Sequence, residues 1–349
     1  MISPKIWIQA ARPKTLPFGL APVCVGSALS YHEGFFSWMT FFLCFFSALF
    51  LQIGANYAND VYDYENGADR QNRIGPVRAV ASGALTTRAM KIGMVTVFSL
   101  AFLFASPLIW REGAILALVF LCVVMIAISY SKGPSYPRKM KNWFFHRRHP
   151  HISAPLHRPC LQQGAASRSA DAWKKSVAPP SKIPNSSFYV GMPLAYLGLG
   201  ELTNLIFMAA LPTQIMYYMQ THQFSFAPFW LGICLGGMTS AVLCMNNLRD
   251  EISDKVAYKG TLVVRFGQKF GKTLFAILTL YPLILPWLLV YFYCLPLGVG
   301  GVFLLIFPAL HLVRATFSST KPQEFLAIFS KVALLALVYI IALSYGLLV

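Results

Sequence analysis

The chain has 349 residues, of which 56% are hydrophobic and 12% are charged, and its mean hydropathy is +0.57. Soluble domains carry about 25% charged residues, so this composition excludes an ordinary soluble protein and indicates a polytopic membrane protein. The net charge of +17 comes from basic residues that flank apolar runs, which argues against nucleic acid as a partner and for anionic lipid or a diphosphate.

Apolar windows of about 20 residues recur along the chain, and each is long enough to cross a bilayer as an α-helix. We expect nine membrane-spanning helices, at about 16–34, 36–57, 89–110, 113–131, 198–219, 226–247, 272–293, 295–314 and 325–348. The segment from Met1 to Leu16 is interrupted by Pro13 and leads into the first span as an interfacial segment. Basic residues stay on the cytoplasmic side, and only Arg111 falls clearly in an outside loop if the N-terminus is cytoplasmic.

Polar residues cluster at the end of the second span, where four of the twelve acids fall within ten residues. Asn56, Asp60 and Asp63 are spaced i, i+4 and i+7, so on a helix they share one face. Carboxylates near hydrocarbon depth cost roughly 2.5–3.5 kcal/mol each, so a cluster there needs cations and predicts a functional site. The natural partner is a hard divalent metal ion that also holds a phosphate. Basic residues that follow, among them Arg73 and Arg78, either set the membrane topology or bind that phosphate.

Between residues 138 and 192 the composition changes abruptly. These 55 residues hold ten Lys or Arg against one acid, four of the seven His, and no apolar span. The Pro, Ser and Arg content has no helical or strand period, which predicts a disordered insert, with a basic arm on anionic lipid headgroups as the alternative. We therefore expect three parts: 1–137 with the first four helices, the insert 138–192, and 193–349 with the last five.

A second polar cluster ends the sixth span. Asn246, Asp250 and Asp254 recur at i, i+4 and i+8, and Asn247 joins Asp250 at i, i+3, so the same one-face argument applies. Two such helix ends suggest two related halves that face one cavity. Lys259 and Arg265 follow and offer a point charge and a bidentate fork for phosphate.

Taken together, these motifs resemble the UbiA superfamily of intramembrane aromatic prenyltransferases, and within it the branch that prenylates 1,4-dihydroxy-2-naphthoate in menaquinone synthesis. The resemblance covers nearly the whole chain except 138–192. It rests on Arg12-Pro13-Lys14-Thr15-Leu16-Pro17, Asn59-Asp60-x-x-Asp63 with Gly67-x-Asp69, Arg73-Ile74-Gly75-Pro76, Asn247-Leu248-Arg249-Asp250-x-x-x-Asp254 and Thr261-Leu262-Val263-Val264-Arg265-x-Gly267. The sequence departs from the general pattern at Gly67, where the superfamily has a third acid, and at Tyr258, where the family usually has Gly.

The resemblance implies an all-α membrane protein of nine transmembrane helices around a cytoplasm-facing cavity, in a bacterial-type inner (plasma) membrane. It implies Mg²⁺ as the cofactor, with a polyprenyl diphosphate and an aromatic acceptor as substrates and lipid around the bundle. The implied catalytic acids are Asp60, Asp63, Asp250 and Asp254. The implied metal ligands are Asn56, Asp60, Asp63, Asp69, Asn247, Asp250 and Asp254. The implied diphosphate-binding residues are Arg73, Arg78, Arg249, Lys259 and Arg265. The implied reaction is prenyl transfer with loss of the acceptor carboxylate, giving demethylmenaquinone.

Two alternatives remain open at this point. The same chemistry could act on another aromatic acceptor, such as 4-hydroxybenzoate or homogentisate. A cation-coupled transporter is a rival from a different class, because carboxylates in a repeated bundle also suit ion coupling. A transporter would more often place its ionisable residues near the midplane, whereas these lie at helix ends beside basic loops.

The junction between the fourth and fifth spans is informative. The family runs directly from a Gly-Pro turn into a Gly-Leu-Gly-Glu stretch, and here the insert separates Gly133-Pro134 from Gly198-Leu199-Gly200-Glu201. We therefore expect either a genuine disordered insertion or a gene-model artefact, which peptide mapping of the natural protein distinguishes.

Overall fold

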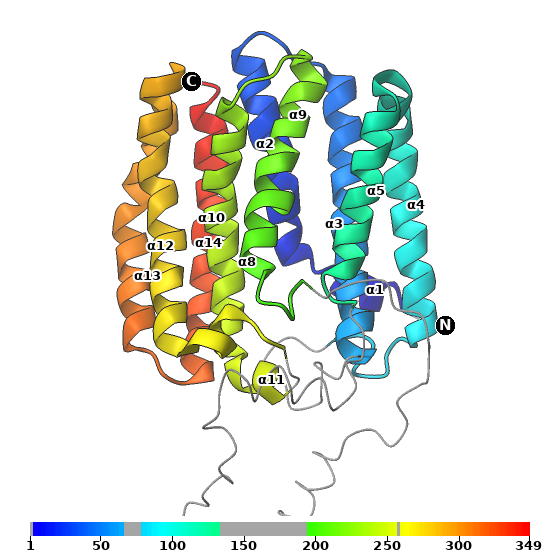
Figure 1. Cartoon of the computed structure of the whole chain (residues 1–349), viewed down its shortest axis with the longest axis vertical. Helices are drawn as coiled ribbons and strands as arrows, with labels where there is room; N and C mark the ends of the chain where they lie inside the picture. Colours follow the sequence, from blue (N-terminus) through cyan, green and yellow to red (C-terminus); the bar gives the residue numbers. More distant parts are fainter. Residues whose placement is uncertain (1–2, 66–77, 133–193, 257–258) are drawn as a thin grey trace, which may run out of the picture. The chain divides into compact units, whose positions relative to one another are not determined.

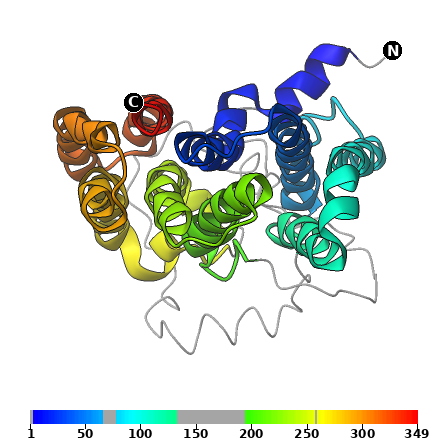
Figure 2. The same cartoon turned by 90° about the horizontal axis from the view of Figure 1, so that it is seen from above.

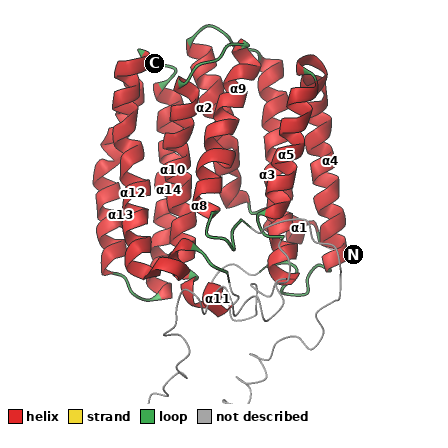
Figure 3. Cartoon of the chain, viewed as in Figure 1, coloured by secondary structure: helices red, strands yellow, loops and turns green. Residues whose placement is uncertain are grey.

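The computed structural model describes residues 3–65, 78–132, 194–256 and 259–349. These residues form helices joined by short turns, and no strand occurs among them (Figure 3). The predicted site residues Asp69 and Arg73, together with the segment 138–192, lie outside the described residues.

The N-terminal part contributes five α-helices and one 3₁₀ turn: α1 (Pro4–Ala11), η1 (Pro13–Thr15), α2 (Leu16–His32), α3 (Trp38–Glu65), α4 (Thr87–Glu112) and α5 (Ala114–Ser129). The C-terminal part contributes α8 (Gly200–Thr203), η3 (Asn204–Ala210), α9 (Leu211–Thr221), α10 (Ala227–Arg249), α11 (Glu251–Val256), α12 (Leu262–Tyr293), η4 (Leu297–Leu305), α13 (Ile306–Ser318) and α14 (Pro322–Gly346). The segment η3 is a π-helix that runs into α8 and α9, and η4 is a 3₁₀ helix that runs into α13.

The predicted helical membrane protein is confirmed, but the count of nine spans is not. Six helical segments in the described residues are long and apolar enough to cross a membrane: 38–65, 87–112, 227–249, 262–293, 297–318 and 322–346. The other predicted spans correspond to α2, which has 17 residues, to α5, which has 16, and to Gly200–Thr221, which the π-helical segment divides. The protein is thus an integral membrane protein, and the larger count stays a prediction.

Two hydrophobic clusters hold the bundle together. One joins α1, α3, α4, α5 and residues 79–85, and the other joins α2, η3, α9, α10, α12, η4, α13 and α14. In Figures 1 and 2, α3, α4 and α5 lie on one side, α12, α13 and α14 on the other, and α2, α9 and α10 between them. In α10, 78% of the most apolar stretch is buried, against 17–39% in the other five long segments, so α10 is the central helix of the bundle.

The N-terminal segment is attached to the bundle by specific contacts. The Tyr57 hydroxyl donates to the carbonyl of Trp7 at 3.2 Å, and the Trp7 ring lies 5.5 Å from the Tyr57 ring. Asn56 Nδ2 donates to the carbonyl of Ala11 at 2.8 Å. The expected lead-in is therefore a short helix packed on α3, ending where Arg12 adopts a left-handed conformation before Pro13.

The chain on either side of the insert is joined by backbone hydrogen bonds. The amide of Leu194 donates to the carbonyl of Ser129 at 3.4 Å, and the amide of Ala195 donates to that of Tyr130 at 3.1 Å. By its internal contacts the chain divides into one unit of Met1–Gly133 with Gly191–Val349 and a second unit of Pro134–Val190. The first unit is therefore joined directly by hydrogen bonds between the residues before and after the insert. The boundaries of the insert stay a prediction.

Candidate functional site

The polar side chains at the end of α3 form two groups with different neighbours. The carboxylate of Asp60 accepts the backbone N–H groups of Ala79 and Val80 at 3.2 and 3.0 Å, and only 1% of the residue is exposed. Asn56 donates to Ala11, as described above. These two predicted metal ligands thus hold the loop after α3 and the N-terminal segment in place, and a metal-binding role for them stays a prediction.

Asn59 and Asp63 form the second group on α3. They are four residues apart and so lie one above the other on the helix. Asn59 Oδ1 accepts a hydrogen bond from the Ser131 hydroxyl at 2.8 Å. Asp63 Oδ2 lies 4.0 Å from Arg78 Nη2, and Asp63 Oδ1 is buried with no hydrogen-bond partner among the described residues. A buried carboxylate oxygen without a partner is costly unless a ligand satisfies it.

The second cluster surrounds the junction of α10 and α11. Asp250 directly follows α10 as its C-cap, and the fork of Arg249 donates to both of its carboxylate oxygens at 2.7 Å. Lys259 Nζ lies 3.8 Å from Asp254 Oδ1, and the Lys259 amide donates to the Asp254 carbonyl at 2.8 Å. The predicted acids and bases of this cluster therefore meet as two ion pairs at one helix junction.

Asn247 points to a residue to which the sequence analysis gave no role. Its Nδ2 donates to Glu201 Oε1 at 2.8 Å, and 6% of Asn247 and 5% of Glu201 are exposed. Glu201 lies in α8 at the start of the predicted fifth span. The sequence does contain a signal for Glu201, because it is an acid at the start of an apolar run. Such acids are rare in membrane-spanning segments unless they are paired, so its position indicates a partner.

The side chain of Arg265 binds the backbone of the preceding loop. Its Nε donates to the carbonyl of Gly260 at 2.8 Å, and the amide of Gly260 donates to the carbonyl of Tyr196 at 3.1 Å. Gly198 has φ +74°, and a Cβ there would lie 2.9 Å from the Gly260 oxygen, so this turn requires glycine. Arg265 thus holds the loop that carries Lys259, and the Gly260 amide joins that loop to the turn before α8.

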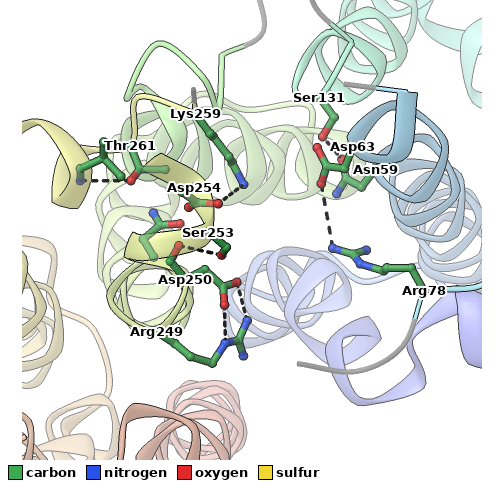
Figure 4. A network of polar contacts seen from close by, with 12 residues as sticks. Asn59, Asp63, Arg78, Ser131, Arg249, Asp250, Ser253, Asp254, Lys259 and Thr261 are labelled. Carbon is green, nitrogen blue, oxygen red and sulfur yellow. Dashed lines mark hydrogen bonds and ion pairs between the residues drawn. The ribbon is translucent and has the colours of Figure 1, made fainter. Parts of the chain in front are cut away.

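The two clusters face each other. Figure 4 shows Asn59, Asp63 and Arg78 on one side, and Asp254 and Lys259 on the other. Tyr130, at the end of α5, interacts electrostatically with both Asp63 and Asp254. The structure therefore brings the ends of α3 and α10 to one site, as the sequence predicts for two polar helix ends.

The donor set suits a hard cation bound together with an anion. The described residues contain no group of three or more His, Cys, Asp or Glu that could hold a metal by themselves. Carboxylate and amide oxygens are the ligands that Mg²⁺ prefers, and Mg²⁺ is commonly held by one or two carboxylates plus substrate phosphates. The buried Oδ1 of Asp63 fits this arrangement, and Arg78 and Lys259 place a positive charge beside Asp63 and Asp254 respectively.

Comparisons with known proteins find matches along most of this chain. The UbiA prenyltransferase family matches residues 19–152 and 184–346. A 1,4-dihydroxy-2-naphthoate octaprenyltransferase of Haemophilus influenzae is 28% identical over 99% of this chain and 96% of the relative, and one of Escherichia coli is 28% identical over 75% and 68%.

Solved structures show the same fold. A UbiA homolog from Archaeoglobus fulgidus bound to DMAPP and Mg²⁺ aligns with a TM-score of 0.53 at 16% identity, over 97% of this chain and 99% of that chain. A digeranylgeranylglyceryl phosphate synthase aligns with a TM-score of 0.55 at 12% identity, over 99% of this chain and 98% of that chain.

Proposed function

This chain belongs to the UbiA prenyltransferase family, and from that premise we propose that it transfers a polyprenyl group from a polyprenyl diphosphate to 1,4-dihydroxy-2-naphthoate. The observation that carries the proposal is the facing pair of helix ends, with Asn59 and Asp63 on one side and Asp254 and Lys259 on the other. Each side offers oxygen ligands and, next to them, a basic side chain. This arrangement suits a diphosphate that is bound through a divalent cation.

We assign the cation to the oxygens of Asn59, Asp63, Asn247 and Asp254, together with the diphosphate. Bound Mg²⁺ would neutralise the charge that develops on the diphosphate as the carbon–oxygen bond breaks. Asp60 and Asn56 act differently in this proposal, because their short hydrogen bonds hold the loop at Ala79 and the end of α1. The residues 66–77 that include Asp69 and Arg73 follow α3 directly and are candidates to complete the site.

The side chains of the protein bind and orient the substrates. Arg78 and Lys259 contact the diphosphate, and the Arg249 fork holds the Asp250 carboxylate in place at the end of α10. The apolar interior excludes water from the allylic carbon once its bond to oxygen has broken. A carbon–carbon bond then forms at the acceptor ring, the ring loses its carboxylate as CO₂, and the product is demethylmenaquinone, formed as its quinol.

The names of the relatives support the choice of aromatic acceptor. Those compared above are named for 1,4-dihydroxy-2-naphthoate, which supports a naphthoate over 4-hydroxybenzoate or homogentisate. The ionisable residues lie at helix ends and not at mid-membrane depth, which supports an enzyme over a cation-coupled transporter. We place this end of the bundle and the N-terminus in the cytoplasm of a bacterial-type cell, because basic residues flank it.

Transfer by the purified protein in lipid nanodiscs tests the proposal. With Mg²⁺, a polyprenyl diphosphate and the naphthoate, we expect product that falls at least about 10²-fold in Asp63→Asn and in Asp254→Asn, since each removes a charge that stabilises the transition state. The matched control is Glu33→Gln, because Glu33 accepts a hydrogen bond from Tyr217 on helices outside the site. Full transfer by both site variants would refute the site, and no transfer by the wild type would refute the reaction.

A further inference from the structure

Glu201 is a buried acid to which the proposed reaction gives no direct task. It lies in α8, and its carboxylate accepts a 2.8 Å hydrogen bond from Asn247 Nδ2. Asn247 is on α10, one turn before Asp250 and two turns before Asp254. Glu201 is therefore next to the second cluster without belonging to it.

The contact fixes the orientation of the Asn247 amide. The Glu201 oxygen accepts from the Asn247 NH₂ group, so the amide oxygen of Asn247 is turned away from Glu201. Without such a partner, the amide could turn over and present N–H groups where a cation needs an oxygen. Partners of this kind commonly orient metal ligands and tune their strength.

The backbone that carries Glu201 is locked against α10. The Ser240 hydroxyl donates to the Glu201 carbonyl at 3.2 Å, and Asn204 Nδ2 donates to Thr239 Oγ1 at 2.8 Å. A Cβ on Gly236 would lie 2.9 Å from the Leu205 Cα, so α10 and η3 are in direct backbone contact. These contacts do not involve the Glu201 carboxylate, so a substitution of that side chain leaves the packing of α8 and η3 on α10 in place.

We propose that Glu201 is a positioning residue that holds the Asn247 side-chain oxygen toward the metal and diphosphate site. The proposal rests on the proposed function, because it gives Asn247 the role of an oxygen ligand. It predicts that Glu201 acts through Asn247, and that the hydrogen bond matters more than the negative charge.

Metal binding by the full chain tests this without turnover. The readout is the apparent Kd of Mn²⁺, measured from the free-ion EPR signal in nanodiscs that hold the protein and geranyl S-thiolodiphosphate, an unreactive diphosphate analogue. Substitutions of residues that orient metal ligands weaken binding about 10- to 100-fold, so we expect that loss in Glu201→Ala. Glu201→Gln keeps an accepting oxygen and should bind nearly as the wild type does, whereas Glu201→Asp keeps the charge but withdraws it and should bind weakly.

A double-mutant comparison shows whether Glu201 acts through Asn247. If it does, Glu201→Ala should weaken Mn²⁺ binding no further in an Asn247→Ala background. Glu33→Gln is the control for a carboxylate that accepts a hydrogen bond elsewhere, and thermal unfolding shows that each variant is folded.

The outcomes separate the two proposals. Normal Mn²⁺ binding by Glu201→Ala, equal losses in Glu201→Gln and Glu201→Ala, or an additive loss in the double variant would overturn the role of Glu201. Normal Mn²⁺ binding by Asp63→Asn, Asp254→Asn and Asn247→Ala alike would instead overturn the proposed metal site.

Discussion

Asp60 and Asp63 are three residues apart on α3, and the structure predicts opposite consequences for their loss. Asp60 accepts two backbone N–H groups from Ala79 and Val80, whereas the carboxylate of Asp63 makes a 4.0 Å contact with Arg78 and no short hydrogen bond to the residues that the structure describes. Hydrogen bonds to a charged group contribute about 1.5–3 kcal/mol each, so Asp60→Ala should lower the free energy of unfolding by roughly 3–6 kcal/mol. Asp63→Asn is nearly isosteric and loses no short hydrogen bond, so its loss should be under about 1 kcal/mol.

Thermal unfolding and transfer, measured on the same purified samples, separate the two residues. We expect Asp60→Ala to unfold at a clearly lower temperature, with Asp60→Asn intermediate because its amide oxygen can still accept one N–H group. Asp63→Asn should unfold as the wild type does and yet lose about 10²-fold or more of the transfer rate. Native stability in Asp60→Ala, or a comparable loss of stability in Asp63→Asn, would refute this division of roles.

The remaining predictions concern the loops and the insert. A variant lacking residues 134–190 should retain its unfolding temperature and transfer, because Leu194 and Ala195 already bond to the chain before the insert; loss of both would show that the insert is required. Lys259→Ala should raise the KM for the prenyl diphosphate about tenfold while the protein stays stable, since one charge-assisted contact of about 1.4 kcal/mol is lost. Arg265→Ala should instead lower stability, because Arg265 binds the Gly260 carbonyl; the reverse pattern in calorimetry and kinetics would contradict both assignments.

Much of the fold follows from the sequence because hydrophobic length is a strong physical signal. The windows at 89–110 and 226–247 agree with α4 and α10 to within two residues at every end. The window at 272–293 misses the start of its helix, because α12 begins at Leu262 and is broken at Gly267, where φ is +85°. Arg265, Gln268, Lys269 and Lys272 lower the hydropathy of this first part of α12 without preventing a helix.

The site is less readable from spacing alone. Asn56, Asp60 and Asp63 lie within one helical face, and nothing in their spacing distinguishes the residues that bind the neighbouring chain from those that face the second cluster. That distinction depends on where Ala11 and the loop at Ala79 come to lie, which is set by tertiary packing. Glu201 is 46 positions from its partner Asn247, so no local pattern indicates their contact.

The central claim is tested most directly by the products of the protein itself. Membranes that contain the protein are incubated with a polyprenyl diphosphate and an equimolar mixture of 1,4-dihydroxy-2-naphthoate, 4-hydroxybenzoate and homogentisate, with Mg²⁺ or with EDTA, and the products are identified by mass spectrometry. We expect prenylated, decarboxylated naphthoquinol as the dominant product, formed with Mg²⁺ and absent with EDTA. Prenylation of another acceptor in preference, or transfer that is unchanged by EDTA, would contradict the account.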